Sequence, residues 1–120
     1  MNQAQVDFQQ LRIKHILFKS KVRSVLYGGT KDEVFFSRSG PLSTWFSSVG
    51  MGRYNDMPGM QELARVQQEL SSTADQLFRL YAGGKIEEAL TGLQQIEEQS
   101  DRFLKSLFRL EEGVSALGAV

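Results

Sequence analysis

The 120-residue sequence predicts an all-α protein: an antiparallel four-helix bundle with three long helices and one short helix in the connection spanning residues 28–58. Apolar residues recur at spacings of three and four along three segments, which is the periodicity of helices with one buried face. Glycine turns separate these segments, with "YGGT" at 27–30 and "AGGK" at 82–85. Short connections between long amphipathic helices are typical of antiparallel bundles.

Composition and charge restrict the classes of function. The 14 basic and 14 acidic residues balance, and no basic stripe of the kind found in nucleic-acid binders is visible. The absence of cysteine excludes disulfides and thiolate chemistry. The polar N-terminus lacks the layout of a secretion signal, and no stretch approaches the roughly 20 apolar residues of a membrane-spanning helix. We therefore expect a cytoplasmic chain that binds neither nucleic acid nor membrane, and the start at Met1 favours a free-standing chain.

The first predicted helix runs from residue 6 to about residue 27. Its apolar stripe has one polar member, His15, which is the only histidine of the chain. The helix is expected to stop at "YGGT", because glycine readily adopts the positive φ of a C-terminal cap. The apolar members of the stripe are Phe8, Leu11, Phe18, Val22 and Val25.

The connection at 28–58 is rich in glycine and serine and holds both prolines, which is typical of irregular structure. Within it, "LSTWFSSV" at 42–49 predicts a short helix. Trp45 is its expected structural anchor, together with Phe46.

The third predicted helix begins after "NDMPG", where Asp56 suits an N-cap and Pro58 suits the first turn. It ends at "AGGK" and carries one large polar interruption, Gln67. The stripe comprises Met60, Leu63, Gln67, Leu70, Ala74, Leu77, Phe78 and Tyr81.

The last predicted helix begins near Ile86 and fades near Glu112. Residues 1–112 are thus expected to form a single domain, followed by a flexible tail at 113–120. The apolar face comprises Ile86, Ala89, Leu90, Leu93, Ile96, Phe103, Leu104, Leu107 and Phe108.

Two large polar side chains, His15 and Gln67, stand where apolar residues are expected, and Ser71 lies one turn after Gln67. Facing helices of a bundle commonly place ligands in this way. The other interpretation is a core histidine that hydrogen-bonds to a residue such as the glutamine opposite. A partner is expected in either case, because a buried unpaired polar group costs about 1–3 kcal/mol.

Four segments occur in an order that resembles the chemoreceptor zinc-binding domain, a small helical bundle of bacterial chemoreceptors and diguanylate cyclases. They are "KHILFKSKV" at 14–22, "GPLSTW" at 40–45 followed by "GRY", "MQELARVQQELSSTADQL" at 60–77 and "GGKIEEAL" at 83–90. The resemblance covers about residues 6–110.

The resemblance places the family's zinc ligands on four positions of this chain: a histidine on His15, a cysteine on Gly40, and a histidine pair on Gln67 and Ser71. Three of these residues depart from the family pattern. Glycine offers no side-chain ligand, and neutral amide and hydroxyl groups are poor zinc ligands. We therefore expect a vestigial site without zinc or another cofactor, and a core polar cluster of His15, Gln67 and Ser71.

The first helix carries a second apolar face formed by Val6, Ile13, Ile16 and Leu17. Either a neighbouring helix of the same chain covers this face, or a second copy of the chain does so in a two-fold dimer. The family resemblance implies a homodimer and favours this face as the dimer interface.

These observations lead to three hypotheses about function. The preferred one is a non-catalytic signalling module that dimerises or docks on a chemoreceptor, a diguanylate cyclase or another partner. The alternative is a metal or small-ligand sensor that uses His15 with non-standard ligands. An enzyme is disfavoured, because the sequence offers one histidine and no clustered core carboxylates. Arg53 and Tyr54 are expected to hydrogen-bond their loop to the bundle.

Overall fold

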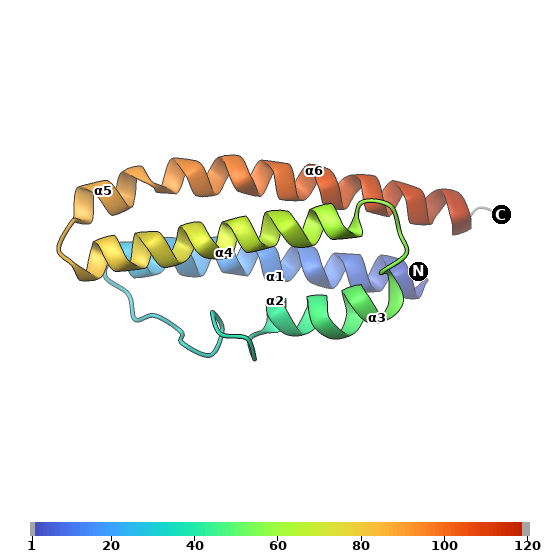
Figure 1. Cartoon of the computed structure of the whole chain (residues 1–120), viewed down its shortest axis with the longest axis horizontal. Coiled ribbons are helices and arrows are strands. Elements are labelled where there is room, and N and C mark those ends of the chain that lie inside the picture. The colour runs from blue at the N-terminus through green and yellow to red at the C-terminus, as the bar shows by residue number, and fades with distance from the viewer. Residues whose placement is uncertain (1, 119–120) are drawn as a thin grey trace.

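The computed structural model describes the backbone of residues 2–118 and the side chains of residues 2–114. It confirms the all-α four-helix bundle, and no β-strand occurs in the described part of the chain. Figure 1 shows the elements in chain order. They are α1 (Gln3–Leu26), α2 (Pro41–Thr44), the π-helical η1 (Trp45–Gly50), α3 (Met51–Arg53), α4 (Met60–Ala82), α5 (Ile86–Thr91) and α6 (Leu93–Gly118).

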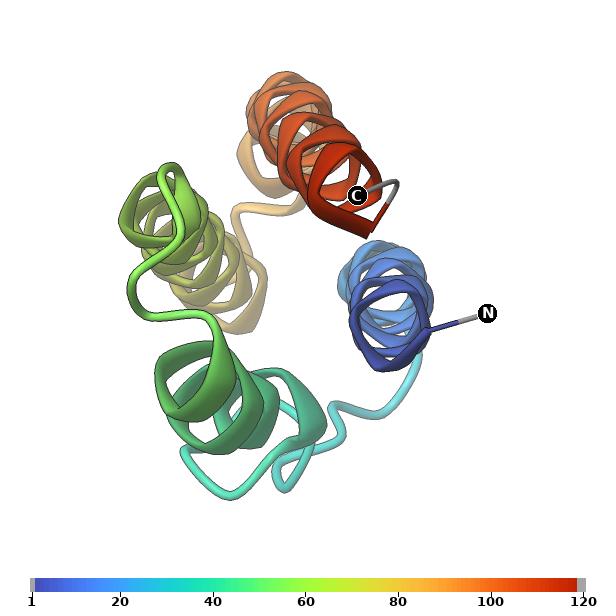
Figure 2. The same cartoon turned by 90° about the vertical axis from the view of Figure 1, so that its right-hand side faces the viewer.

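Four helical rods occupy the corners of the bundle when it is viewed end-on (Figure 2). Around the bundle, α1 is followed by α6, then α4, then the short rod formed by α2, η1 and α3. Neighbouring rods run in opposite directions, so both ends of the described chain lie at the same end of the molecule (Figure 1). The bundle measures 55 × 25 × 21 Å. Its core receives buried side chains from every rod, including Phe8, Leu11, Val22, Trp45, Leu63, Leu70, Ile96, Phe103 and Leu107.

The short rod is longer than the helix predicted at 42–49, because helical backbone continues from Pro41 to Arg53. Its middle is a π-helix, Trp45–Gly50, which widens the turn around the indole. Trp45 is 3% exposed, and its ring stacks edge-on against Phe46 with centroids 5.1 Å apart. Trp45 therefore holds this rod to the core, as the sequence predicted.

The predicted start of the third helix is wrong. Asp56 is not an N-cap and Pro58 is not in the first turn, because α4 begins at Met60 with Gly59 as its N-cap. Gly59 has a φ of 94°, a left-handed conformation that a helix cannot include and that glycine adopts without penalty. The chain therefore turns at residues 57–59 before the helix starts.

The last predicted helix is interrupted and extended. Gly92 separates α5 from α6, and a side chain at that position would collide with Leu77 of α4. The helix does not fade near Glu112 but continues to Gly118, with Val114 buried. The predicted tail at 113–120 is therefore helical through residue 118, and residues 119–120 lie outside the described residues. Phe108, expected on the core face, is 57% exposed.

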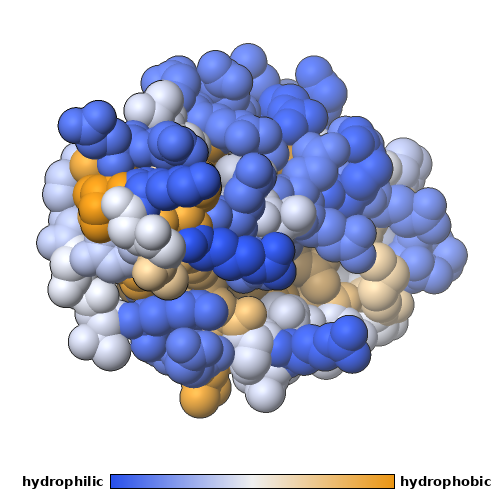
Figure 3. Space-filling model, turned by 60° about the vertical axis from the view of Figure 1, so that its left-hand side comes forward, coloured by the Kyte–Doolittle hydropathy of each residue, from blue (hydrophilic) through white to orange (hydrophobic). Residues whose placement is uncertain are grey.

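The face of the bundle drawn in Figure 3 is largely hydrophilic. Figure 3 brings the left-hand end of Figure 1 forward and shows hydrophobic residues as a discontinuous band between hydrophilic rows. Within residues 2–118, none of the helices combines the length and apolar composition needed to cross a lipid bilayer.

Candidate functional site

His15 lies in the centre of the bundle, because it occupies a core position of the α1 stripe. Its side chain is 0% exposed. The Nε2 atom lies 2.7 Å from Ser100 Oγ on α6. The imidazole also stacks on Phe103, with ring centroids 4.2 Å apart and ring planes 9° from parallel. The His15 side chain thus packs against α6, with one hydrogen bond to Ser100 and one aromatic contact with Phe103.

The surroundings of His15 keep its imidazole neutral. Burial lowers the pKa of His15 to about 4, with a further contribution from the charge of Lys19, while Glu97 opposes the shift. The ring is therefore uncharged at neutral pH. Its Nδ1 atom is buried and has no hydrogen-bond partner among the described residues.

Of the predicted polar cluster of His15, Gln67 and Ser71, the structure shows one internal hydrogen bond, between Gln67 and Ser71. Gln67 Nε2 donates to Ser71 Oγ at 3.2 Å, one turn along α4. No hydrogen bond joins His15 to either residue within the described side chains; its partner is Ser100. Gln67 is 7% exposed, and its Oε1 atom is buried without a partner in the described part of the chain. The two polar interruptions therefore have different hydrogen-bond partners: Ser100 on α6 for His15, and Ser71 on α4 for Gln67.

The four positions that the resemblance matched to zinc ligands do not fit a zinc ion. Gly40 is the buried N-cap of α2, and a Cβ atom there would collide with the carbonyl oxygen of Phe35. His15 directs its Nε2 at Ser100, and Gln67 and Ser71 bond to each other. No group of three potential histidine, cysteine, aspartate or glutamate ligands occurs among the described residues. This donor set offers a single imidazole where zinc requires three or four strong ligands.

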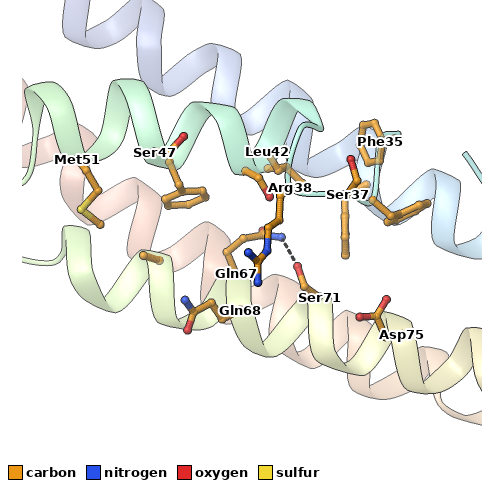
Figure 4. A pocket seen from close by; sticks show the side chains of 15 residues that line it. Phe35, Ser37, Arg38, Leu42, Ser47, Met51, Gln67, Gln68, Ser71 and Asp75 are labelled. Atoms are coloured by element: carbon orange, nitrogen blue, oxygen red, sulfur yellow. Dashed lines mark hydrogen bonds between the residues drawn. The ribbon is translucent and has the colours of Figure 1, made fainter. Parts of the chain in front are cut away.

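A pocket of about 530 Å³ lies between α4, the short rod and the loop that precedes it. Figure 4 shows Gln67, Gln68, Ser71 and Asp75 on the α4 side. The volume lies within the range of pockets that hold small organic ligands. The opposite wall carries aromatic side chains, which are Phe18, Phe35, Phe36 and Phe46.

Arg38 spans the pocket from the loop towards α4. Its guanidinium lies over Gln67, Gln68 and Ser71 (Figure 4). Arg38 is exposed and forms no ion pair with any other described residue. Asp75, the other charged residue of the lining, lies farther along α4. The pocket therefore combines an apolar wall, a polar wall, one cation and one anion.

A second polar centre lies near the start of α1, around the buried carboxylate of Asp7. The carboxylate accepts hydrogen bonds from Arg53 Nη1 at 2.8 Å, Tyr54 Oη at 2.6 Å and Gln3 Nε2 at 2.8 Å. Trp45 Nε1 donates to the backbone oxygen of Asp7 at 3.1 Å. The prediction that Arg53 and Tyr54 hydrogen-bond their loop to the bundle is confirmed, with Asp7 as the acceptor.

Hydrogen bonds decide the charge state of this centre. Burial alone would raise the pKa of Asp7, but the hydrogen bonds from Tyr54, Gln3 and Arg53 and the charge of Arg53 hold it below its ordinary value. Burial and the bond to Asp7 raise the pKa of Tyr54 to about 12. The charged carboxylate, bonded to this phenol and guanidinium, therefore joins α1 to the end of α3.

The second apolar face of α1 is open to solvent. Ile13, Ile16 and Leu17 are 61%, 56% and 44% exposed, and Val6 is half-buried. No neighbouring helix of the described chain covers the three exposed residues, so the first of the two sequence interpretations is wrong. On the adjacent α6, Phe108 is also exposed.

Sequence reasoning missed three residues that the structure places in these sites. Ser100 was recognisable as a polar residue on the apolar face of the last helix, between Ile96 and Phe103. Asp7 adjoins Phe8 on the core side of α1, but its partners Arg53 and Tyr54 come from the connection that the sequence predicts to be largely irregular. Arg38 carries no sequence signal, because only the path of the loop brings it to the pocket.

A scan against known protein families, a search of curated proteins and a search of solved structures each found no match.

Proposed function

We propose that this chain is a non-catalytic bacterial signalling module, a zinc-site-deficient relative of the chemoreceptor zinc-binding domain, which acts by dimerising through α1. The observation that carries this proposal is the uncovered apolar face of Ile13, Ile16 and Leu17. Contiguous apolar surface on a small protein marks interaction sites, because its burial releases water and stabilises the complex.

The α1 face is a suitable contact surface because its backbone is held in place. Arg12 pairs with Glu111, and both Lys19 and Arg23 pair with Glu97, so three ion pairs between described residues join α1 to α6. From Val6 to Leu17 the face extends about 16 Å along the helix. A rigid helical surface of this kind binds with little loss of conformational entropy.

A second copy of the chain is the occupant that the charge pattern favours. The exposed apolar residues lie outside the ion-paired seam, so two copies can bring Ile13 and Leu17 together across a two-fold axis. The formal net charge of zero removes long-range repulsion between the copies.

The interior of the bundle supports a role without catalysis. His15 is the only histidine, and its ring is completely buried and hydrogen-bonded to Ser100. A general base must come within hydrogen-bond reach of the substrate proton, which this ring cannot do. Packed helices that shift between discrete arrangements offer a means of signalling to a chemoreceptor or a diguanylate cyclase.

Sedimentation of the complete chain tests the dimer. We expect a dimer for the wild type and a monomer for Ile13→Glu, because two buried unpaired carboxylates would face each other at the axis. Val34→Glu is the matched control, since Val34 is 67% exposed in the loop after α1. A wild type that stays monomeric at high concentration, alike for Ile13→Glu, would remove dimerisation from the proposal.

Partner docking has its own measurement. The cytoplasmic part of a chemoreceptor or a diguanylate cyclase from the same cell is titrated with labelled wild-type chain and with the two variants. Saturable binding that Ile13→Glu weakens and Val34→Glu preserves supports docking through α1. Equal binding of both variants, or none to either class of partner, contradicts it.

A further inference from the structure

We propose that the pocket between α4 and the short rod binds a small organic monocarboxylate with a flat apolar body. This inference goes beyond the proposed dimer, because the exposed residues Ile13, Ile16 and Leu17 of α1 do not line the pocket. The pocket would give the bundle a ligand-binding site separate from the dimer contact.

The apolar part of the ligand is set by the aromatic wall. Phe18 and Phe35 are buried, and Phe36 and Phe46 are partly exposed towards the pocket. Phe36 is packed edge-on against Phe18, with ring centroids 5.5 Å apart. Ring edges and faces presented together favour a planar ligand that stacks in an offset or edge-to-face arrangement.

The carboxylate of the ligand is set by Arg38. Its guanidinium lies over the pocket and has no ion-pair partner among the described residues. A guanidinium presents two parallel N–H donors that match the two oxygens of a carboxylate. Ser71 lies below it on α4 and offers a further hydroxyl donor to the same anion (Figure 4).

The orphaned amide of Gln67 is an independent indication that the polar wall is incomplete. Gln67 is 7% exposed, and its Oε1 atom is buried without a hydrogen-bond partner in the described part of the chain. His15 Nδ1 and Gln99 Oε1 are likewise buried without a described partner, but of the three residues only Gln67 lines the pocket, where a bound ligand or water can supply the partner. As placed, Oε1 is an acceptor and cannot pair with a carboxylate. A half-turn of the amide would let Oε1 accept from Ser71 Oγ and would put Nε2, a donor, in the unpaired position.

Asp75 limits the charge of the ligand to one negative unit. It lies on the same α4 wall as Ser71, farther from Arg38 (Figure 4). With one arginine and one aspartate, the lining has no net charge, so a second anionic group would meet Asp75 without a compensating cation. Dicarboxylates and phosphates are therefore disfavoured.

The backbone around the pocket is of the kind that can respond to a ligand. Phe46 and Ser47 line the pocket from η1, a π-helical turn. π-helical turns are rare and occur frequently at functional sites. Because Phe46 contacts Trp45, a bound ligand would also change the environment of the only tryptophan.

The test is a titration of the uniformly labelled complete chain with phenylacetate, followed by amide chemical shifts. We expect saturable shifts centred on Arg38, Phe46 and Ser71, with a dissociation constant on the order of 1 mM for so small a probe. Phenylacetamide has the same size and no charge, and we expect it to bind about tenfold more weakly. No saturable shift up to about 20 mM, equal binding of the amide, or shifts confined to other surfaces would overturn the proposal.

Two variants separate the contributions of charge. Arg38→Gln should weaken phenylacetate binding about tenfold, whereas Arg79→Gln, an exposed arginine of α4 outside the pocket lining, should leave it unchanged. Asp75→Asn should admit the dianion phenylmalonate, which the wild type excludes. Binding that is indifferent to Arg38→Gln, or a wild type that prefers phenylmalonate, would contradict the assigned ligand class. All three substituted residues are exposed, so the variants should fold, and circular dichroism checks this.

Discussion

The two polar residues that interrupt the core stripes have opposite environments. His15 of α1 is enclosed, with Nε2 2.7 Å from Ser100 Oγ and its ring against Phe103. Gln67 of α4 lines a pocket of about 530 Å³ and leaves its Oε1 atom unpaired among the described residues. One polar interruption belongs to the rigid interior, and the other belongs to a site with room for another molecule.

The difference shows that a polar residue in an apolar stripe does not by itself indicate a site. Whether such a residue lines a binding site depends on the element that packs against its side of the helix. His15 contacts Ser100 and Phe103 of the long helix α6, whereas Gln67 lines the pocket that α4 shares with the short rod and its preceding loop. Proteins commonly place binding at such irregular elements on a rigid scaffold.

Truncating one aromatic residue in each environment should give the largest contrast. Phe103 is 0% exposed and stacks on His15, so Phe103→Ala should cost about 3–5 kcal/mol of unfolding free energy. Phe46 is a partly exposed pocket wall, so Phe46→Ala should cost about 1–2 kcal/mol. Urea unfolding followed by circular dichroism measures both, and equal losses would remove the distinction between the enclosed and the open region.

Acid should destabilise the enclosed region through His15. Its pKa is about 4 in the folded state and ordinarily 6.5, so the unfolded chain binds the proton more readily in between. The stability contribution is complete above about pH 6.5 and is lost as the pH falls towards 4, by about 3 kcal/mol. Unfolding free energies measured across this interval should fall with decreasing pH.

His15→Gln is the control for the pH effect, because the amide keeps a polar group near Ser100 but does not titrate. Carboxylates such as Asp7, whose pKa is below its ordinary value, act at lower pH and in both proteins. The slope between pH 6.5 and 4 should therefore be much smaller in the variant. A slope that persists unchanged would show that His15 is not the titrating group.

Substituting the serine partner of each polar residue should also distinguish the two sites, with smaller losses of unfolding free energy. Ser100 is 0% exposed, so Ser100→Ala would leave the Nε2 atom of His15 without a partner and should cost about 1–3 kcal/mol. Ser71 is exposed, so water can replace its hydroxyl and Ser71→Ala should stay within about 0.5 kcal/mol. A cost at Ser71 that matches Ser100 would mean that the pocket wall is as closed as the interior.

The helices were predictable because their periodicity and glycine turns are local signals. The stripes of α1 and α4 identified buried residues such as Leu11 and Leu70. The start of α4 was not predictable with the same security, since Asp56 has the chemistry of an N-cap. The backbone of Gly59, with its φ of 94°, decides the boundary, and no property of Asp56 reveals that.

The sites were less predictable because they depend on which helices become neighbours. The stripe placed His15 and Gln67 in the interior, but periodicity within one helix does not say which rod faces each residue. Ser100 became the partner of His15 because α6 packs beside α1. Arg38 reached the pocket through the path of an irregular loop, which has no sequence period.

Gln67→Leu should have the smallest effect and the most informative sign. The wild-type amide has an unpaired buried oxygen, and replacing it with an apolar group of similar size removes that desolvation penalty. The unfolding free energy should therefore stay unchanged or rise by up to about 1 kcal/mol.

The comparison variant is Gln99→Leu. The Oε1 atom of Gln99 on α6 is likewise buried without a described partner, but Gln99 does not line the pocket. If Gln67 serves a bound ligand, Gln67→Leu should weaken phenylacetate binding while Gln99→Leu preserves it. A clear loss of stability in Gln67→Leu would instead make Gln67 a structural member of the core, equivalent to His15.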